Sequence, residues 1–345
     1  MKPFTNRLLG LAAGIAVAFA ATSTLAVDLT GAGATFPYPI YAKWAEAYKA
    51  KTGVGLNYQP IGSGGGIAQI KAKTVTFGAS DKPLQLSDLQ ASGLTQFPTV
   101  IGGVVPVVNI PGVKAGELVL DGKTLADICI GNVKYWDDGA VKRLNPGVNL
   151  PHLAVVGVHR SDGSGTNFIF TDYLSKKSPQ WASQVGAATA VDWPTGVGAK
   201  GNEGVAENVR QANGSIGYVE YAYAKQNHLA YVRMINHDGV PTEPTAAAFQ
   251  AASARTDWAH APGFYVVLTD QPGHDAWPIA GATFIIVYKN PADPNAQKEA
   301  LKFFKWAYEN GDSLAESLDY VALPQTTKDD VYKSWQANIV PASLP

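Results

Sequence analysis

The chain has 345 residues, of which 46% are hydrophobic and 16% are charged. Its 27 basic and 28 acidic residues leave a formal charge of −1, which excludes a function that relies on bulk attraction to nucleic acid or another polyanion. A chain of this length and composition can support more than one hydrophobic core, so we expect two domains.

Residues 1–26 have the pattern of a cleaved secretory signal. Lys2 and Arg7 precede an apolar run over 8–20, and small residues follow that run. The run is shorter than the roughly 20 residues that a membrane-spanning helix needs, so we expect no membrane insertion. Loss of Lys2 and Arg7 takes the basic residues from 27 to 25 against 28 acidic ones, a charge of −3. Cys129 is the single cysteine and allows no internal disulfide. We therefore expect an exported, periplasmic protein.

After the signal, short apolar runs alternate with stretches of helical periodicity. The order of strand, loop and helix occurs four times. This alternation predicts α/β layers around a largely parallel sheet. The four predicted pairs of strand and helix are 27–29 with 41–48, 55–59 with 67–73, 153–158 with 168–174, and 284–288 with 296–308.

Two segments are candidates for crossing between lobes. The first is the buried strand predicted over 100–108, and the second is the stretch 271–278, after which a strand resumes. If both cross, lobe I is discontinuous, with residues 27–100 and 272–345, and lobe II holds residues 101–271. Two connecting strands between two α/β lobes form a hinge, and a ligand in the cleft between the lobes can hold them closed.

Three segments place a hydroxyl beside glycine directly before a helical run. The hydroxyl can bind or cap, the glycine lets a ligand reach the backbone, and the N–H groups of the first helical turn carry the positive end of the dipole. Taken singly, each hydroxyl also suits a plain helix cap. Together they predict a site for a tetrahedral oxyanion. The segments are Gly33-Ala34-Thr35-Phe36, Gly62-Ser63-Gly64-Gly65-Gly66 and Ser164-Gly165-Thr166-Asn167.

Three charged residues make this prediction more specific. Arg160 ends an apolar strand and can offer a planar fork to two anion oxygens, and Asp162 can restrain it. Asp81 follows another predicted strand, and ligands gather at the carboxyl ends of strands in open α/β sheets. An ionised carboxylate only accepts hydrogen bonds, so it favours phosphate, which still carries a proton, over sulfate. A site built on such a donor rejects an analogue that lacks it by roughly 10⁴ to 10⁵.

Several motifs together resemble the PstS family, the periplasmic phosphate-binding proteins of high-affinity phosphate ABC transporters. The likeness follows the same order over the whole mature chain and reaches the C-terminal segments. The motifs are Gly31-Ala32-Gly33-Ala34-Thr35-Phe36-Pro37, Phe77-Gly78-Ala79-Ser80-Asp81, Phe97-Pro98-Thr99-Val100-Ile101-Gly102-Gly103, Arg160-Ser161-Asp162-Gly163-Ser164-Gly165-Thr166, Gly217-Tyr218-Val219-Glu220-Tyr221-Ala222-Tyr223-Ala224-Lys225, Leu318-Asp319-Tyr320 and Leu323-Pro324.

The resemblance implies a two-lobed, hinge-closing carrier without cofactor, metal or catalysis. This monomer would bind inorganic phosphate in the periplasm and deliver it to the permease of an ABC transporter in the inner membrane. Departures from the family pattern are Gly64, where a second serine is familiar, and His159, where a second arginine can occur. The implied phosphate contacts are Thr35, the backbone N–H of Phe36, Ser63, Asp81, Arg160, Ser164, Gly165 and Thr166, with Asp162 in support.

Two alternative functions stay open. The first is a carrier of another tetrahedral oxyanion, such as sulfate, molybdate or arsenate, and the second is a phosphatase-like enzyme that uses the same contacts. A hydrolase built on Ser164, His159 and Asp162 is disfavoured. Neighbouring residues of one strand and turn cannot easily form a nucleophile, base and orienting group, and no Gly-x-Ser-x-Gly elbow occurs.

Overall fold

The computed structural model describes residues 29–345, so the predicted signal segment lies outside the described residues. The strands are β1 Leu29–Gly33, β2 Leu56–Pro60, β3 Phe77–Ser80, β4 Leu94–Asn109, β5 Val119–Leu120, β6 Val156–Arg160, β7 Val197–Ala199, β8 Ser215–Glu220, β9 Ala230–Tyr231, β10 Arg233–Ile235, β11 Pro241–Thr242, β12 Ala280–Tyr288 and β13 Val321–Ala322. The α-helices are α1 Tyr38–Thr52, α2 Ser63–Lys71, α3 Leu86–Ala91, α4 Gly122–Ile130, α5 Gly139–Leu144, α6 Gly165–Lys177, α7 Pro179–Gln184, α8 Gly201–Gln211, α9 Tyr221–Gln226, α10 Ala246–Ser253, α11 Pro294–Asn310, α12 Asp312–Glu316 and α13 Gln325–Asn338; η1 Pro262–Phe264 and η2 Pro341–Ser343 are 3₁₀ turns.

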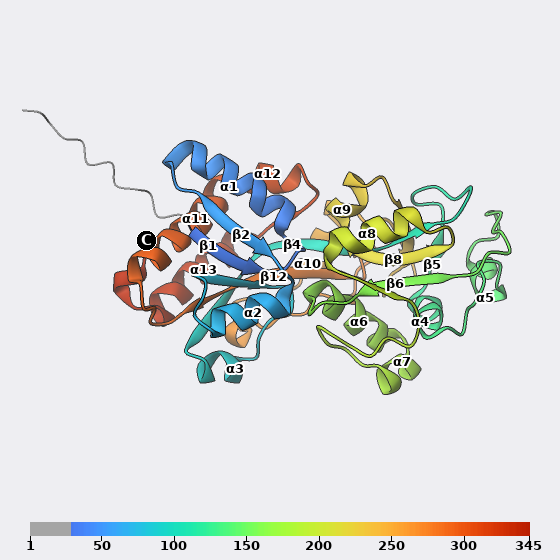
Figure 1. Ribbon diagram of the computed structural model, residues 1–345, viewed down its shortest axis with the longest axis horizontal. Helices are drawn as coiled ribbons and strands as arrows, with labels where there is room; N and C mark the ends of the chain where they lie inside the picture. The colour runs from blue at the N-terminus through green and yellow to red at the C-terminus, as the bar shows by residue number, and fades with distance from the viewer. Residues whose placement is uncertain (1–28) are drawn as a thin grey trace, which may run out of the picture.

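The elements form two lobes on either side of a long central strand (Figure 1). The first and last parts of the chain, blue and red, lie together in one lobe, and the green and yellow middle part forms the other. Strand β4 has 16 residues and belongs to both lobes. Its residues 94–103 pair with β12, and its residues 104–109 pair with β8. The two-lobed α/β fold predicted from the sequence is therefore confirmed.

The main sheet is mixed rather than largely parallel. Its order is β2-β1-β3-β12-β4-β8-β6-β7, with β13 and β9 also paired to β4. Strand β1 runs parallel to β2 and β3, and β6 runs parallel to β7 and β8. The pairs in the middle, which involve β4 and β12, are antiparallel because the chain leaves the first lobe along β4 and re-enters it along β12. The parallel flanks agree with the predicted alternation of strand and helix.

All four predicted pairs of strand and helix form, with the start of the first strand outside the described residues. They are β1 with α1, β2 with α2, β6 with α6, and β12 with α11. Local signals mark their helix ends. Asp293 caps α11 by accepting the N–H groups of Asn295 and Ala296, and Gly53 ends α1 with φ of 79°. The loops between each strand and its helix thus lie at the carboxyl ends of the strands.

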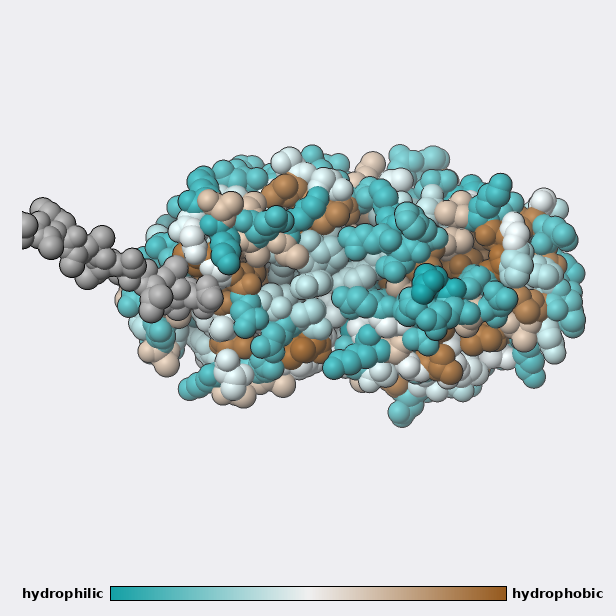
Figure 2. All heavy atoms as spheres, turned by 45° about the horizontal axis from the view of Figure 1, so that its top comes forward, coloured by the Kyte–Doolittle hydropathy of each residue, from teal (hydrophilic) through white to brown (hydrophobic). Residues whose placement is uncertain are grey.

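Buried aromatic side chains anchor the first lobe. Trp44 and Tyr48, four residues apart on α1, are buried, and the ring of Tyr48 packs 5.4 Å from that of Phe303 on α11. On the face shown in Figure 2, hydrophobic side chains are interspersed with hydrophilic ones. Among residues 29–345, every helix is too short or too polar to span a bilayer.

One segment packs in a place that the sequence does not signal. Gly263 in η1 accepts a hydrogen bond of 2.8 Å from Gln96 on β4, and the ring of Trp258 lies 6.2 Å from that of Phe284 on β12. These partners belong to the first lobe, whereas the predicted division puts residues 101–271 in the second. The segment has no apolar periodicity that would have assigned it to either lobe. This segment therefore packs on the first lobe before β12 returns to it.

Candidate functional site

The residues predicted to bind an anion come together where the two lobes meet. They lie in the loops after β1 and β3, at the last residue of β6, and at the starts of α2 and α6. Every one of their side chains is at most 4% exposed, so the site is closed to bulk water. These buried residues, together with Gly165, are called the cradle below. Its side chains are those of Thr35, Phe36, Ser63, Asp81, Arg160, Ser164 and Thr166.

Only one of the three predicted hydroxyls is used as a helix cap. Ser164 accepts the N–H of Asn167 at 3.0 Å and so caps α6. Helix α1 instead starts after Pro37, and α2 starts after Gly62, in both cases without a side-chain cap. The hydroxyls of Thr35 and Ser63 are therefore available for a different role in the cradle.

Ser63 joins the two lobes. Its Oγ accepts the N–H of Asp81 at 3.1 Å and the N–H of Gly165 at 3.0 Å. A hydroxyl oxygen has two lone pairs, and both are used here, so the hydrogen of Ser63 must be donated elsewhere. The contact also requires glycine at 165, because a Cβ there would lie 2.5 Å from Ser63 Oγ and 2.5 Å from Asp81 Cβ. Ser63 is thus a donor at the surface where the lobes touch.

Arg160 supplies a fixed cation. Its Nε and Nη2 donate to Asp162 at 2.7 and 2.6 Å, and Asp162 also accepts the N–H of Gly201 at 3.1 Å. Burial alone would raise the pKa of Asp162, but its bonds to Arg160 lower it below the ordinary value, so the carboxylate stays ionised. Arg160 Nη1 is buried and has no hydrogen-bond partner in the described part of the chain. The predicted restraint by Asp162 therefore leaves one guanidinium nitrogen free to bind.

Asp81 supplies the acceptor. Its Oδ1 accepts the hydroxyl of Thr283 at 2.7 Å, while its Oδ2 is buried and has no partner within residues 29–345. Burial raises the pKa of Asp81 to about 7, against the lowering effects of Thr283 and Arg160. An unpaired buried carboxyl oxygen is costly, so its presence indicates a ligand that donates a hydrogen bond to it.

The loop that carries Thr35 and Phe36 is held by buried tyrosines. Tyr223 donates to the carbonyl of Thr35 at 2.7 Å, and Tyr320 donates to the carbonyl of Phe36 at 2.6 Å. The N–H of Phe36 donates to no backbone carbonyl in the described chain, which leaves it available for a ligand. Asn202 on α8 bonds the Thr35 hydroxyl at 2.7 Å.

The sequence reasoning missed Thr283 and Asn202. Thr283 lies in Gly281-Ala282-Thr283-Phe284, which repeats the residue types of Gly33-Ala34-Thr35-Phe36 but lies inside strand β12 rather than before a helix. Both residues reach the cradle through long-range packing. Thr283 precedes Phe284, which pairs with Ser80 beside Asp81. The one available signal for Asn202 is its position in the first turn of a helix after Gly201, which has a positive φ of 73°.

The buried Asp81 predicts a pH-dependent stability of the phosphate-free protein. In the unfolded chain its pKa is about 4, and in the closed cradle it is about 7, so the folded state binds the extra proton between these values. The contribution of Asp81 to the free energy of unfolding is therefore full below pH 4 and falls as pH rises to 7. The steepest slope is about 1.4 kcal/mol per pH unit.

Denaturant unfolding of the phosphate-free protein at several pH values checks this expectation. Burial also raises the pKa of Glu220. The slope of the free energy of unfolding against pH in the native protein therefore contains contributions from both carboxyl groups. The Asp81→Asn variant provides the comparison and should lose less stability between pH 4 and 7 than the native protein. Equal slopes for the two proteins would contradict the buried titration of Asp81.

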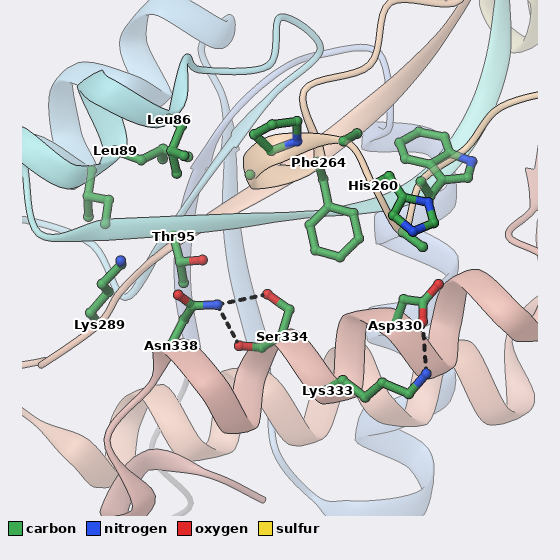
Figure 3. Close-up of a pocket in the computed structure, with 16 residues that line it drawn as sticks. Leu86, Leu89, Thr95, His260, Phe264, Lys289, Asp330, Lys333, Ser334 and Asn338 are labelled. Carbon is green, nitrogen blue, oxygen red and sulfur yellow. Dashed lines mark hydrogen bonds and ion pairs between the residues drawn. The ribbon is translucent and has the colours of Figure 1, made fainter.

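An open pocket elsewhere on the first lobe does not share these properties. This pocket of about 370 Å³ lies between α3, η1 and α13 (Figure 3). Two pairs of polar side chains on α13 at its edge bond to each other: Lys333 lies 3.0 Å from Asp330, and Asn338 donates to Ser334. Unlike the cradle, its charged pair at α13 is already satisfied. The cradle is therefore the stronger candidate for an anion site.

Comparison with known proteins agrees with this fold. A model of the PBP superfamily domain matches residues 20–310. The phosphate-binding protein PstS of Pasteurella multocida is 50% identical over 319 residues, which are 92% of this chain and 93% of the relative. PstS of Haemophilus influenzae is 50% identical over 312 residues, 90% of this chain and 93% of the relative. A phosphate-binding protein from Stenotrophomonas maltophilia has a similar structure, with a TM-score of 0.68 at 20% identity over 92% of this chain and 97% of that one.

Proposed function

The chain belongs to the PstS family of phosphate-binding proteins, and from this premise we propose that its cradle binds inorganic phosphate for delivery to an ABC-type importer. One observation carries the assignment to the cradle. Asp81 Oδ2 and Arg160 Nη1 are both buried at the same site, and neither has a partner among the described residues. One is an acceptor and the other a donor, so a guest that both donates and accepts hydrogen bonds would satisfy both.

Phosphate fits this pair better than sulfate does. At neutral pH phosphate keeps at least one proton, which Asp81 can accept, and its remaining oxygens can accept from Arg160 and from the hydroxyl of Ser63. Sulfate is fully ionised and would leave Asp81 Oδ2 facing a second negative charge. The phosphate contacts in this proposal are Thr35, Phe36, Ser63, Asp81, Arg160, Ser164, Gly165 and Thr166, with Asp162 holding Arg160.

The positions of these residues support a carrier that encloses phosphate by closing its two lobes. Ser63 and Asp81 come from the first lobe, and Arg160 and Gly165 come from the second, so both lobes must meet to complete the cradle. In this proposal lobe I consists of residues 27–100 and 272–345, and lobe II consists of residues 101–271, of which the segment around η1 packs on lobe I. The protein acts in the periplasm as a carrier, not as an enzyme. The relatives bear the name of phosphate-binding proteins, which supports this part.

A titration tests the proposal. Isothermal calorimetry at neutral pH with phosphate should give saturable binding of one equivalent, and the same titration with sulfate should give no heat of binding. Arsenate should bind, because its shape and protonation resemble those of phosphate. Incubation with a chromogenic phosphate ester should release no product. Equal binding of sulfate would favour a general oxyanion carrier, and steady ester turnover would favour a phosphatase.

A further inference from the structure

Asn202 connects the two lobes inside the cradle. It is fully buried in the first turn of α8. Its Nδ2 lies 2.7 Å from the hydroxyl of Thr35, which belongs to the first lobe, and 3.3 Å from the hydroxyl of Thr166 on α6. One side chain thus contacts two of the hydroxyls assigned to phosphate.

The orientation of this amide is determined by the backbone. Asn202 Oδ1 lies 3.0 Å from the N–H of Glu220, at the end of β8. A backbone N–H can only donate, so the oxygen of the amide must face Glu220. The NH₂ group must then face Thr35 and Thr166, and in both contacts the threonine oxygen is the acceptor.

This arrangement controls where the hydroxyl hydrogen of Thr35 points. Thr35 Oγ1 accepts from Asn202 Nδ2 and, at 3.3 Å, from the backbone N–H of Asn202 as well. Both lone pairs of the oxygen are then used, so its hydrogen can only be donated. Among residues 29–345, Thr35 Oγ1 is the acceptor in both of its hydrogen bonds, and its hydrogen has no acceptor there. A bound anion would be that acceptor.

We propose that Asn202 is a positioning residue that makes the Thr35 hydroxyl a donor toward the bound anion, also contacts the Thr166 hydroxyl, and ties this orientation to lobe closure. The inference rests on the proposed function of the cradle. A free hydroxyl can turn either its hydrogen or a lone pair toward a ligand, and only the first is useful for phosphate. Asn202 removes this choice for Thr35 when the lobes close.

Two substitutions at 202 separate orientation from simple packing. Asn202→Ala removes the donor to both hydroxyls, and phosphate affinity should fall about tenfold, the loss of roughly one hydrogen bond. Asn202→Asp keeps the shape and the acceptor for Glu220, but it offers Thr35 an acceptor and so draws the hydroxyl hydrogen away from the anion. Its added negative charge also opposes the anion, and affinity should fall at least about a hundredfold.

The background Thr35→Val distinguishes positioning from a structural role. If Asn202 acts through the Thr35 hydroxyl, Asn202→Ala should cost only about threefold in this background, because only the contact with Thr166 remains to be lost. Calorimetric titrations with phosphate measure the native protein, both Asn202 variants, Thr35→Val and the double variant, and thermal unfolding without phosphate confirms that each is folded. Equal losses in both backgrounds, or native affinity in both Asn202 variants, would overturn the inference. Failure of the native protein to bind phosphate would instead refute the proposed function, and this inference with it.

Discussion

The Asp81→Asn variant is expected to lose most of the discrimination between phosphate and sulfate. The amide oxygen can still accept the hydroxyl of Thr283, and the NH₂ group then replaces Oδ2. The cradle thus gains a donor where the carboxylate offers only an acceptor. Sulfate no longer faces an unpaired negative charge and gains a donor, so its affinity should rise. Phosphate loses a charge-assisted hydrogen bond, and its affinity should fall about tenfold. A preference of roughly 10⁴ to 10⁵ should thereby shrink by at least about a hundredfold.

Calorimetric titration of both anions at pH 7.5 measures this change. Asp275→Asn is the matched control, because it removes one negative charge from a side chain that is 84% exposed and touches no part of the cradle. The control should keep the native affinities, which excludes an effect of net charge. If Asp81→Asn still failed to bind sulfate and kept the native affinity for phosphate, Asp81 would not be the residue that selects the anion.

The local contacts that the sequence predicted around the cradle are those encoded in short segments. Ser164 precedes a helix and caps it, and Arg160 ends a strand two residues before Asp162, so local geometry alone brings that ion pair together. Strand alternation places His159 on the opposite face from its neighbour Arg160, and the His159 ring stacks 4.8 Å from that of Trp193. Alternation along one strand is enough to separate these two neighbours.

The parts that were missed depend on contacts between distant segments. Asn202 and Thr35 are 167 positions apart, and Thr283 reaches Asp81 across 202 positions. No periodicity or motif records which strands become neighbours, and that pairing decides which polar groups enter the cradle. Long-range register also explains the mixed sheet, since β12 could run parallel or antiparallel to β4 with the same residues. Sequence patterns specify elements and local turns better than they specify how the elements meet.

Substitution of Gly165 by alanine is expected to prevent closure and to weaken phosphate binding about a thousandfold. A Cβ at this position would lie 2.5 Å from Ser63 Oγ and 2.6 Å from Asp81 Oδ2, far inside contact distance. The lobes would have to separate by more than a side-chain adjustment allows. Phosphate would then lose contacts from one lobe, and each hydrogen bond to a charged group is worth about 1.5–3 kcal/mol. Two such bonds account for the expected loss.

The fold of each lobe should not suffer from this substitution, which makes the effect specific to closure. Gly165 begins α6 with a φ outside the positive region, and alanine stabilises a helix relative to glycine by up to about 1 kcal/mol. Gly147→Ala is the matched control, since a Cβ there meets nothing within 4 Å. Titration with phosphate and small-angle scattering with and without phosphate should show an open, weakly binding Gly165→Ala protein beside a native-like control. If Gly165→Ala bound phosphate with native affinity, Ser63 and Gly165 could not be in contact in the phosphate-bound state, because the added methyl group has no room there.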